Sequence, residues 1–345
     1  MRILVTGGCG YIGSHTIVDL LQNGHTVICL DNCSRASTAT IDRIKKITGV
    51  RVPFLHMNLE DPRLFVFLSL YQPIDAVIHF AAFKAVGESV QNPLMYYDNN
   101  LRPLINLLHA CDKRGIKNVV FSSSCTVYGE PDAIPVSEDT QIKPASSPYG
   151  ATKQMGERIL TDWANRLSAN VKVSLLRYFN PAGAHPSADL GEETADAPQN
   201  LTPVLVQVAA GKRPELQVFG GDYPTRDGSC VRDFIHVCDI AAAHRKALEY
   251  MLDGRQEEPV SIFNLGAGQG VTVLEAVHAF EAATGLPVSH RIVDRRPGDV
   301  SAIYGDNTKA REVLGWTLQY GMEDIMRTAW AYFLKCREET EERQS

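Results

Sequence analysis

The sequence predicts an α/β protein in which a doubly wound parallel sheet is joined to a smaller, interleaved α/β domain on the C-terminal side. Three observations predict this fold. Apolar runs alternate with helix-like segments through the first half, a glycine-rich turn follows the first run, and the alternation breaks after about residue 180. Near-continuous apolar strands followed by helices indicate a parallel sheet covered on both faces.

The predicted elements follow from the spacing of apolar residues. We expect strands at residues 3–6, 26–30, 51–56, 76–80, 119–122 and 173–178, and helices at 12–23, 39–48, 62–70, 93–114 and 148–167. Segments 181–200 and 220–229 are rich in turn-forming residues and predict long loops. A helix at 237–251 and a strand at 261–265 are expected to rejoin the first sheet.

These elements predict two interleaved domains. The first comprises residues 1–180 together with 237–265, and the second comprises residues 181–236 and 266–345. A chain of 345 residues is long enough for two packed regions.

Composition argues against several classes of function. The net charge of -6 gives no basic surface for nucleic acid. No window approaches the roughly 20 apolar residues of a membrane span, and the first residues lack the layout of a signal peptide. The eight cysteines form no CxxC pair, so neither a metal site nor a disulfide framework is predicted. We therefore expect a cytoplasmic protein with reduced thiols, without nucleic-acid or membrane partners.

The glycine-rich turn predicts a dinucleotide site. Residues 7–13 read GGCGYIG, so Gly7, Gly10 and Gly13 fit GxxGxxG, and an overlapping GxGxxG begins one residue later. Such glycines let the backbone approach a pyrophosphate bound at the N-terminus of the next helix. Asp31 ends the following predicted strand, where an acid accepts from the ribose hydroxyls and repels a 2′-phosphate. The nearby Arg35 weighs slightly the other way. The pattern is that of a Rossmann-type domain and favours NAD over NADP.

Tyr149 and Lys153 stand four residues apart, which places both on one face of a helix. A free phenol has a pKa of about 10 and is a poor base at neutral pH. A neighbouring ammonium and the positive nicotinamide would favour the phenolate. Ser122 to Ser124 end a predicted strand, and a serine there is able to hydrogen-bond a substrate hydroxyl. Together these residues predict hydride transfer at a hydroxyl-bearing carbon, with Tyr149 as acid and base.

These motifs resemble the extended short-chain dehydrogenase/reductase superfamily. More narrowly, the chain is similar to the UDP-glucose 4-epimerase family over nearly its whole length. The matching stretches include VTGGCGYIGSHT, HFAAFKAVGESV, YYDNN, SSSCTVYG, SPYGATK, LRYFNPAGAHPS, VRDFIHV, NLGAG and RRPGD. The resemblance implies reversible epimerisation of UDP-glucose and UDP-galactose at carbon 4. It passes through a transient 4-keto sugar, with the hydride stored on tightly bound NAD.

The resemblance also implies a role for individual residues. The catalytic residues would be Tyr149 as acid and base, Ser124 as the group that holds the 4-oxygen, and Lys153, which binds the nicotinamide ribose and keeps Tyr149 acidic. The implied cofactor-binding residues are Gly7, Gly10, Tyr11, Ile12, Gly13, Asp31, Asn32, Asn58, Leu59, Phe80, Ala81, Ala82, Lys84, Asn99, Ser122, Tyr149, Lys153, Tyr178 and Phe179. The implied UDP-sugar residues are Lys84, Ser124, Tyr149, Asn180, Asn200, Leu201, Val218, Phe219, Arg232, Arg296, Asp299 and Ile303. A homodimer through helices 93–114 and 148–167 is also implied.

Three positions depart from the usual family pattern. Asn58 replaces an aspartate near the adenine, and Phe234 replaces a tyrosine. Ile303 stands at the position that gates the sugar pocket, where a bulky tyrosine restricts the family to UDP-hexoses and a small residue admits N-acetylated sugars. Because Ile303 is of intermediate size, we expect UDP-N-acetylhexosamines to be poor substrates.

Other functions remain open alternatives. A 4-epimerase of UDP-glucuronate, UDP-pentose or UDP-N-acetylhexosamine fits the same motifs. A nucleotide-sugar dehydratase fits less well, because its added acid and base are an Asp-Glu pair where this chain has Cys125 and Thr126. A non-catalytic NAD-binding regulator is a different class of protein. Such regulators typically lack the tyrosine or the lysine that this chain retains.

Overall fold

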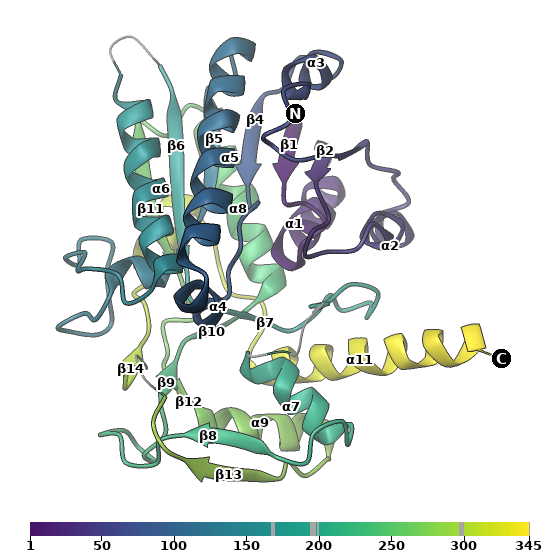
Figure 1. The fold of residues 1–345 in the computed structure, drawn as a ribbon, viewed down its shortest axis with the longest axis vertical. Coiled ribbons are helices and arrows are strands. Elements are labelled where there is room, and N and C mark those ends of the chain that lie inside the picture. Colours follow the sequence, from purple (N-terminus) through teal and green to yellow (C-terminus); the bar gives the residue numbers. More distant parts are fainter. Residues whose placement is uncertain (167–169, 194–197, 199, 297–299, 345) are drawn as a thin grey trace.

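The central feature is a seven-stranded, wholly parallel sheet with the strand order β11-β6-β5-β4-β1-β2-β3 (Figure 1). The computed structural model describes residues 1–166, 170–193, 198, 200–296 and 300–344. The strands are β1 (Arg2–Thr6), β2 (Thr26–Asp31), β3 (Phe54–His56), β4 (Ala76–His79), β5 (Asn118–Ser124), β6 (Lys172–Tyr178) and β11 (Val260–Leu265). The predicted doubly wound α/β fold is therefore confirmed.

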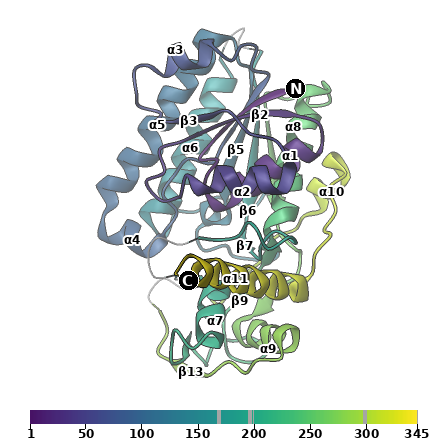
Figure 2. The same cartoon turned by 90° about the vertical axis from the view of Figure 1, so that its right-hand side faces the viewer.

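Helices cover both faces of this sheet (Figures 1 and 2). One face carries α1 (Tyr11–Gln22), α2 (Ala39–Thr48), α8 (Val237–Leu252) and α10 (Thr308–Leu314). The other carries α3 (Leu64–Ser69), α5 (Pro93–Arg114) and α6 (Pro148–Ala164). A short helix, α4 (Val86–Gln91), precedes α5, and a 3-10 turn at Cys125–Tyr128 follows β5.

The strands are apolar on both sides because each side packs under helices. In β1, Ile3 and Val5 enter the core beneath α1 and α8, whereas Leu4 enters the core beneath α3 and α5. Adjacent residues of a strand point to opposite faces, so a run without polar interruptions suits a sheet covered twice. Burying each such side chain contributes about 1.5–3 kcal/mol.

A second region lies beyond the carboxyl ends of the strands, toward which the arrows of the sheet point (Figure 1). It contains three small sheets and a core built around Leu205, Phe280 and Met326. The sheets pair β7 (Asn180–Ala182) with β10 (Phe234–His236), β8 (Leu216–Phe219) with β13 (His290–Val293), and β9 (Val231–Arg232) with β12 (Val271–Thr272) and β14 (Ala302–Ile303). The helices are α7 (Leu201–Ala209), α9 (Val273–Thr284) and α11 (Met322–Gln344).

The chain crosses between the two regions more than once. After β6 it forms β7, α7 and β8 in the second region, then returns through α8 to β11, which pairs with β6 along the edge of the main sheet. The division into domains at residues 180, 236 and 265 stays a prediction.

Some element boundaries differ from the sequence prediction. The strand expected at 51–56 is limited to Phe54–His56, because Pro53 has no N–H to donate to the ladder. The helix expected at 62–70 begins at Leu64, after Asp61 accepts a hydrogen bond from the N–H of Arg63. Helix α6 ends at Ala164, and residues 167–169 lie outside the described part of the chain. Helix α4 was not predicted.

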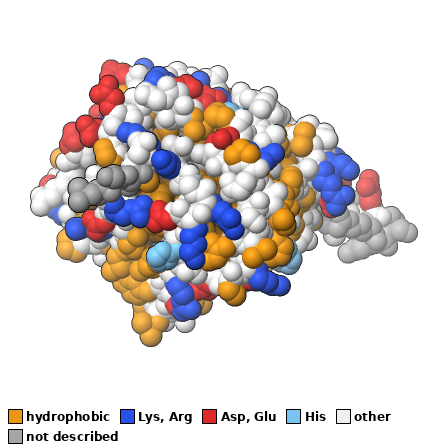
Figure 3. Space-filling view, turned by 90° about the horizontal axis from the view of Figure 1, so that it is seen from above, with side chains coloured by type: hydrophobic (Ala, Val, Ile, Leu, Met, Phe, Trp, Pro, Cys, Tyr) orange, Lys and Arg blue, Asp and Glu red, His pale blue; other side chains and the backbone are white. Residues whose placement is uncertain are grey.

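Each helix among the described residues is too short or too polar to span a lipid bilayer. On the face at the amino ends of the strands, positive and negative side chains are interspersed with apolar ones (Figure 3).

Candidate active site

The glycine turn connects β1 to α1 at the carboxyl edge of the sheet. Gly7 has φ +69°, and a Cβ there would lie 2.6 Å from the amide nitrogen of Ala81. A Cβ on Gly13 would lie 2.3 Å from the carbonyl oxygen of Gly7. Gly10 is the N-cap of α1, and no described side chain caps the helix there. The turn therefore needs glycine and presents backbone N–H groups at a helix N-terminus, where an anion binds.

Asp31 is fixed beside this turn. One carboxylate oxygen accepts from the N–H of Cys9 at 2.9 Å, and the other accepts from the N–H of Cys33 at 2.8 Å. Asn32 accepts from the N–H of Ser34 at 3.0 Å. Each oxygen of Asp31 keeps a second lone pair, so the carboxylate is positioned to accept from ribose hydroxyls.

The segment after β4 forms the opposite side of the turn. Phe80, Ala81 and Ala82 continue directly from this strand, and Ala81 lies against Gly7. The Lys84 ammonium lies 2.8 Å from Glu192 and 5.7 Å from the centroid of the Tyr11 ring. This pair joins two loops that are 108 residues apart in sequence.

The loop that contains Lys84 is held by Asn100. Asn100 accepts from the N–H of Phe83 at 2.8 Å and donates to the carbonyl oxygen of Phe83 at 3.1 Å. It also donates to the hydroxyl of Thr152 on α6 at 3.0 Å. Asn99 donates to Asn100 at 2.9 Å. The expected place of Asn99 beside the cofactor stays a prediction.

Tyr149 and Lys153 lie on α6 and face the end of β5. Their residues are 8% and 5% exposed. Helix α6 begins here because Pro148 occupies its first turn and Ser147 accepts from the N–H of Gly150 at 3.2 Å. The Lys153 ammonium donates to the carbonyl oxygen of Ser122 at 2.6 Å and lies 5.9 Å from the centroid of the Tyr149 ring.

The protonation of this pair is set by burial. Burial raises the pKa of Tyr149 to about 12, while a hydrogen bond from Ser124 opposes the rise. Burial also lowers the pKa of Lys153 to about 8. We expected the ammonium to favour the phenolate, but burial outweighs it in the protein alone. The phenol is therefore protonated at neutral pH.

Strand β6 brings three further predicted residues to the same place. Tyr178 shares a buried hydrogen bond with the hydroxyl of Ser122, Phe179 follows it, and Asn180 starts β7. The structure thus brings Ser122, Ser124, Tyr149, Lys153 and Tyr178 together at the carboxyl ends of β5 and β6.

A buried ion pair beneath this group was not predicted. Arg177 donates to both carboxylate oxygens of Glu157, at 2.9 and 2.6 Å. Ser123 donates to the same carboxylate at 2.5 Å, and Arg177 donates to the hydroxyl of Tyr128 at 3.1 Å. The pair ties α6 to β5 and β6, and so it fixes the helix that carries Tyr149. Its sequence signal is an arginine inside an apolar strand.

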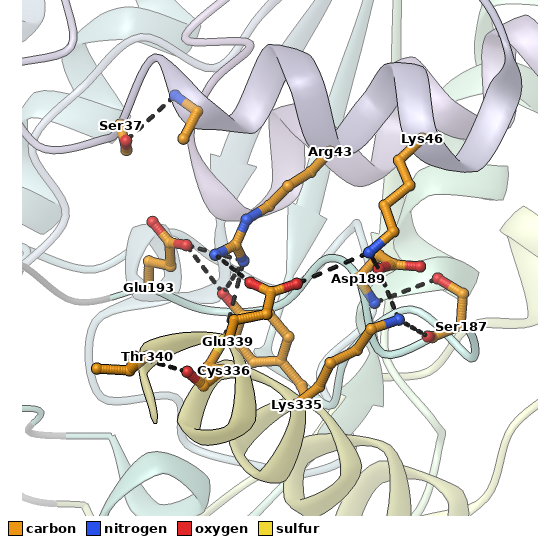
Figure 4. Close-up of polar contacts among 12 residues, drawn as sticks. Ser37, Arg43, Lys46, Ser187, Asp189, Glu193, Lys335, Cys336, Glu339 and Thr340 are labelled. Atoms are coloured by element: carbon orange, nitrogen blue, oxygen red, sulfur yellow. Dashed lines mark hydrogen bonds and ion pairs between the residues drawn. The ribbon is translucent and has the colours of Figure 1, made fainter. Parts of the chain in front are cut away.

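A small polar pocket lies against the outer side of the glycine turn, lined among others by Gly10, Tyr11, Arg35, Arg43 and Tyr332. Helices α2 and α11 meet at this pocket (Figure 4). Arg43 donates to the hydroxyl of Tyr332 at 2.7 Å and pairs with Glu193 at 2.9 Å. Two lysines extend the contact: Lys46 and Lys335 lie 2.7 and 2.6 Å from Asp189. This contact was not predicted.

The remaining predicted cofactor residues lie after β3 and at the start of α1. Asn58 accepts from the N–H of Glu60 at 3.3 Å, and Leu59 is buried. Ile12 lies in the first turn of α1, beside Tyr11, whose hydroxyl donates to the carbonyl oxygen of Gly183 at 2.6 Å.

The predicted UDP-sugar residues come from several elements of the second region. Asn200 and Leu201 start α7, and Val218 and Phe219 end β8. The Arg296 guanidinium lies 4.2 Å from the centroid of the Phe219 ring. Arg232 donates to the carbonyl oxygen of Val300 at 2.9 Å. Asp299 lies outside the described residues.

Ile303 lies in a buried cluster that includes Cys125, the residue after Ser124. It pairs with Arg232 in the small sheet, is buried, and packs in one cluster with Cys125 and Phe179. The departure at Phe234 is also buried, in the second core. In the part of the chain that the structure describes, no group of three or more His, Cys, Asp or Glu side chains is arranged to hold a metal ion.

The fold and this site define an extended short-chain dehydrogenase/reductase. The sequence matches the GDP-mannose 4,6 dehydratase family over residues 4–329. It is 48% identical over 332 residues to the UDP-glucose 4-epimerase of Bacillus subtilis, which covers 96% of each chain. The chain belongs to the UDP-glucose 4-epimerase family.

Solved structures agree with this assignment. The UDP-glucose 4-epimerase of Stenotrophomonas maltophila, with bound NAD and formylated UDP-arabinopyranose, superposes with a TM-score of 0.94 at 44% identity. The alignment covers 98% of this chain and 99% of that one. The enzyme of Bifidobacterium longum, in complex with NAD+ and UDP, gives 0.91 at 42% identity, covering 97% and 98%.

Proposed function

We propose that this chain interconverts UDP-glucose and UDP-galactose by inverting carbon 4 of the sugar, with NAD as a retained hydride store. The observation that carries the proposal is the position of Tyr149. Its buried phenol lies on α6 beside Ser124 and Lys153. This is the carboxyl edge of the sheet, where the glycine turn follows β1.

The residues at this edge fit a dinucleotide. The turn holds glycine where a Cβ would collide with the backbone, its helix N-terminus suits the pyrophosphate, and Asp31 suits the ribose. NAD, when bound, supplies the acceptor and donor of the hydride and a positive charge near the phenol. That charge would lower the pKa of Tyr149 from its raised value toward neutrality.

The chain's own residues would handle the proton. Tyr149 removes the proton of the 4-hydroxyl, and Ser124 holds the oxygen as the carbonyl forms. Lys153, fixed by the carbonyl of Ser122, contributes its charge without leaving its place. The sugar would then turn about its pyrophosphate link while residues of the second region keep the UDP, and Tyr149 returns the proton. Arg232 and Arg296 are cations suited to that pyrophosphate.

A dehydratase is less well supported. The residues after Ser124 are Cys125 and Thr126, and burial raises the pKa of the Cys125 thiol to about 12. Such a thiol cannot serve as the added base that loss of water needs at neutral pH. The sugar range is proposed as UDP-hexoses, with UDP-N-acetylhexosamines as poor substrates, because the intermediate-sized Ile303 is buried in one cluster with Phe179 and Cys125.

We also propose a cytoplasmic homodimer. Helices α5 and α6 pack side by side, and they expose apolar side chains that include Leu94, Ile105 and Met155. Leu94 is 81% exposed, which suits contact with a second copy. The free cysteines suit a reducing compartment.

The decisive experiment uses purified protein with UDP-galactose and no added NAD. We expect UDP-glucose to form until the two sugars equilibrate, because the cofactor is retained and net redox is zero. A protein that binds NAD but leaves UDP-galactose unchanged would instead be the regulator of a different class. Rapid conversion of UDP-glucuronate alone would point to the related epimerase.

A further inference from the structure

The cofactor cleft lies where the winding of the sheet changes direction. The chain continues from β1 to β2 on one side, while β4 lies on the other. Ligands of doubly wound sheets bind in the crevice at such a point. Two loops flank this crevice, residues 32–38 after β2 and residues 80–85 after β4, and the glycine turn lies between them.

Arg35 links these two sides. It belongs to the loop after β2 and lines the pocket beside Gly10 and Tyr11. Its guanidinium nevertheless lies 2.6 Å from Glu88, at the start of α4, and 4.8 Å from the centroid of the Phe83 ring. Arg35 therefore makes two attractive contacts with the loop and helix after β4. Its guanidinium pairs with a carboxylate and lies over the face of an aromatic ring.

The partner carboxylate is held in place. The other oxygen of Glu88 accepts from the hydroxyl of Tyr96 at 2.7 Å, and that hydroxyl accepts from the N–H of Ala85 at 3.0 Å. Tyr96 is fully buried on α5. The hydrogen bond from Tyr96 and the Arg35 guanidinium lower the pKa of Glu88, so it is charged at neutral pH.

The Arg35–Glu88 pair contributes little to the stability of the fold. Its side chains are 41% and 28% exposed, and pairs of this kind add little to folding. The pair joins the two rims of the crevice. Among the described residues, no backbone–backbone hydrogen bond outside the helices and strands connects residues 32–38 to Glu88.

We propose that Arg35 and Glu88 form a clasp across the cofactor cleft that slows the release of NAD. The inference rests on the proposed function, because it concerns the same cofactor. Opening the cleft breaks the ion pair and the contact with Phe83, whereas hydride transfer itself uses neither. Arg35 is therefore a positioning residue for cofactor retention, not a catalytic residue.

The test measures NAD release directly. Holoenzyme is diluted into an enzyme that consumes free NAD, and the rate of loss of bound NAD is followed without any UDP-sugar. We expect Arg35→Gln and Glu88→Gln each to speed release by about fivefold, which corresponds to the upper range for an exposed pair. The double variant should be no faster than either single one. The exchanged pair Arg35→Glu with Glu88→Arg should recover much of the slow rate.

A matched control is Arg166→Gln. Arg166 pairs with Asp112 at 2.7 Å with similar side-chain exposure, 43% and 35%. This pair joins the C-terminal ends of α5 and α6, away from the glycine turn. Its NAD release should equal that of the wild type. High salt should speed release from the wild type more than from the two single variants.

Each other outcome has a defined meaning. Unchanged release in both single variants would overturn the clasp. Faster release in Arg35→Gln alone would also overturn it, since Arg35 would then hold the cofactor directly. A protein that releases NAD as expected but never converts UDP-galactose would overturn the proposed function and leave the clasp standing. A protein that binds no NAD would overturn both.

Discussion

The Lys153 ammonium donates a hydrogen bond to the backbone carbonyl oxygen of Ser122 at 2.6 Å. This contact anchors α6 to the end of β5, so that Tyr149 and Ser124 face the same space. We propose that Lys153 acts on Tyr149 through its charge at a distance, since its nitrogen lies 5.9 Å from the centroid of the phenol ring. The geometry therefore separates the residue that moves the proton from the residue that tunes it.

Tyr149→Phe should lower kcat for UDP-galactose by about 10²–10⁴-fold, because only the proton-transfer group is lost. The bound NAD and the thermal midpoint should stay close to those of the wild type. Assays of product formation, with NAD content measured after denaturation, check both points. Full activity in this variant would refute the role of the phenol.

Lys153 should make the stability of the NAD-free protein depend on pH. Burial lowers its pKa from 10.5 to about 8, so between these values the unfolded chain binds more protons than the folded one. The free energy of unfolding should therefore rise with pH from about 8 to 10. Over this window the wild type should gain about 2–3 kcal/mol relative to Lys153→Met. Above pH 10, Tyr149 opposes this trend, because its pKa is raised to about 12.

Urea unfolding at pH 7, 8, 9 and 10 measures this difference. Parallel curves for the two proteins would show that Lys153 is not desolvated in solution.

The buried pair of Glu157 and Arg177 should be costly to break from one side. Glu157→Leu leaves the Arg177 charge buried without its partner and should lower the free energy of unfolding by about 3–5 kcal/mol. The double variant with Arg177→Met should recover most of this loss. Arg158→Ala, which breaks an exposed pair with Asp162 on the same helix, is the control and should change stability by less than about 0.5 kcal/mol.

Ile303→Ser should widen the sugar range. The change removes bulk from the cluster with Phe179 and Cys125. We expect kcat/KM for UDP-N-acetylgalactosamine to rise by at least about tenfold relative to UDP-galactose. A change of this size is typical when a pocket gains or loses room for a methylene group. Comparable efficiency of the unaltered enzyme on both sugars would show that Ile303 does not restrict the pocket.

The sequence predicted those parts of the molecule that depend on local order. The apolar runs predicted the parallel sheet. The turn at residues 7–13 predicted a dinucleotide site at the end of β1. The Tyr149 and Lys153 spacing put both side chains on one helical face, because a helix turns every 3.6 residues. All of these follow from neighbours in the chain.

The features that were not predicted depend on residues far apart in the sequence. Arg177 stands out as an arginine inside an apolar strand, but its partner Glu157 is identified only when α6 packs against β6 and buries the two together. Lys84 was predicted as a binding residue, but its ion pair with Glu192 was not, because the two residues are 108 positions apart. The raised pKa of Tyr149 comes from burial, a property that no spacing of residues records.

The contact between Arg43 and Tyr332 has a consequence for how the protein is made. Tyr332, on α11, closes one wall of the pocket beside Gly10, although it follows that glycine by more than 300 positions. During translation the glycine turn emerges first and that wall emerges last. This wall of the pocket is thus added only after most of the second region has been synthesised, so a nascent chain that ends before α11 lacks the contact between Arg43 and Tyr332.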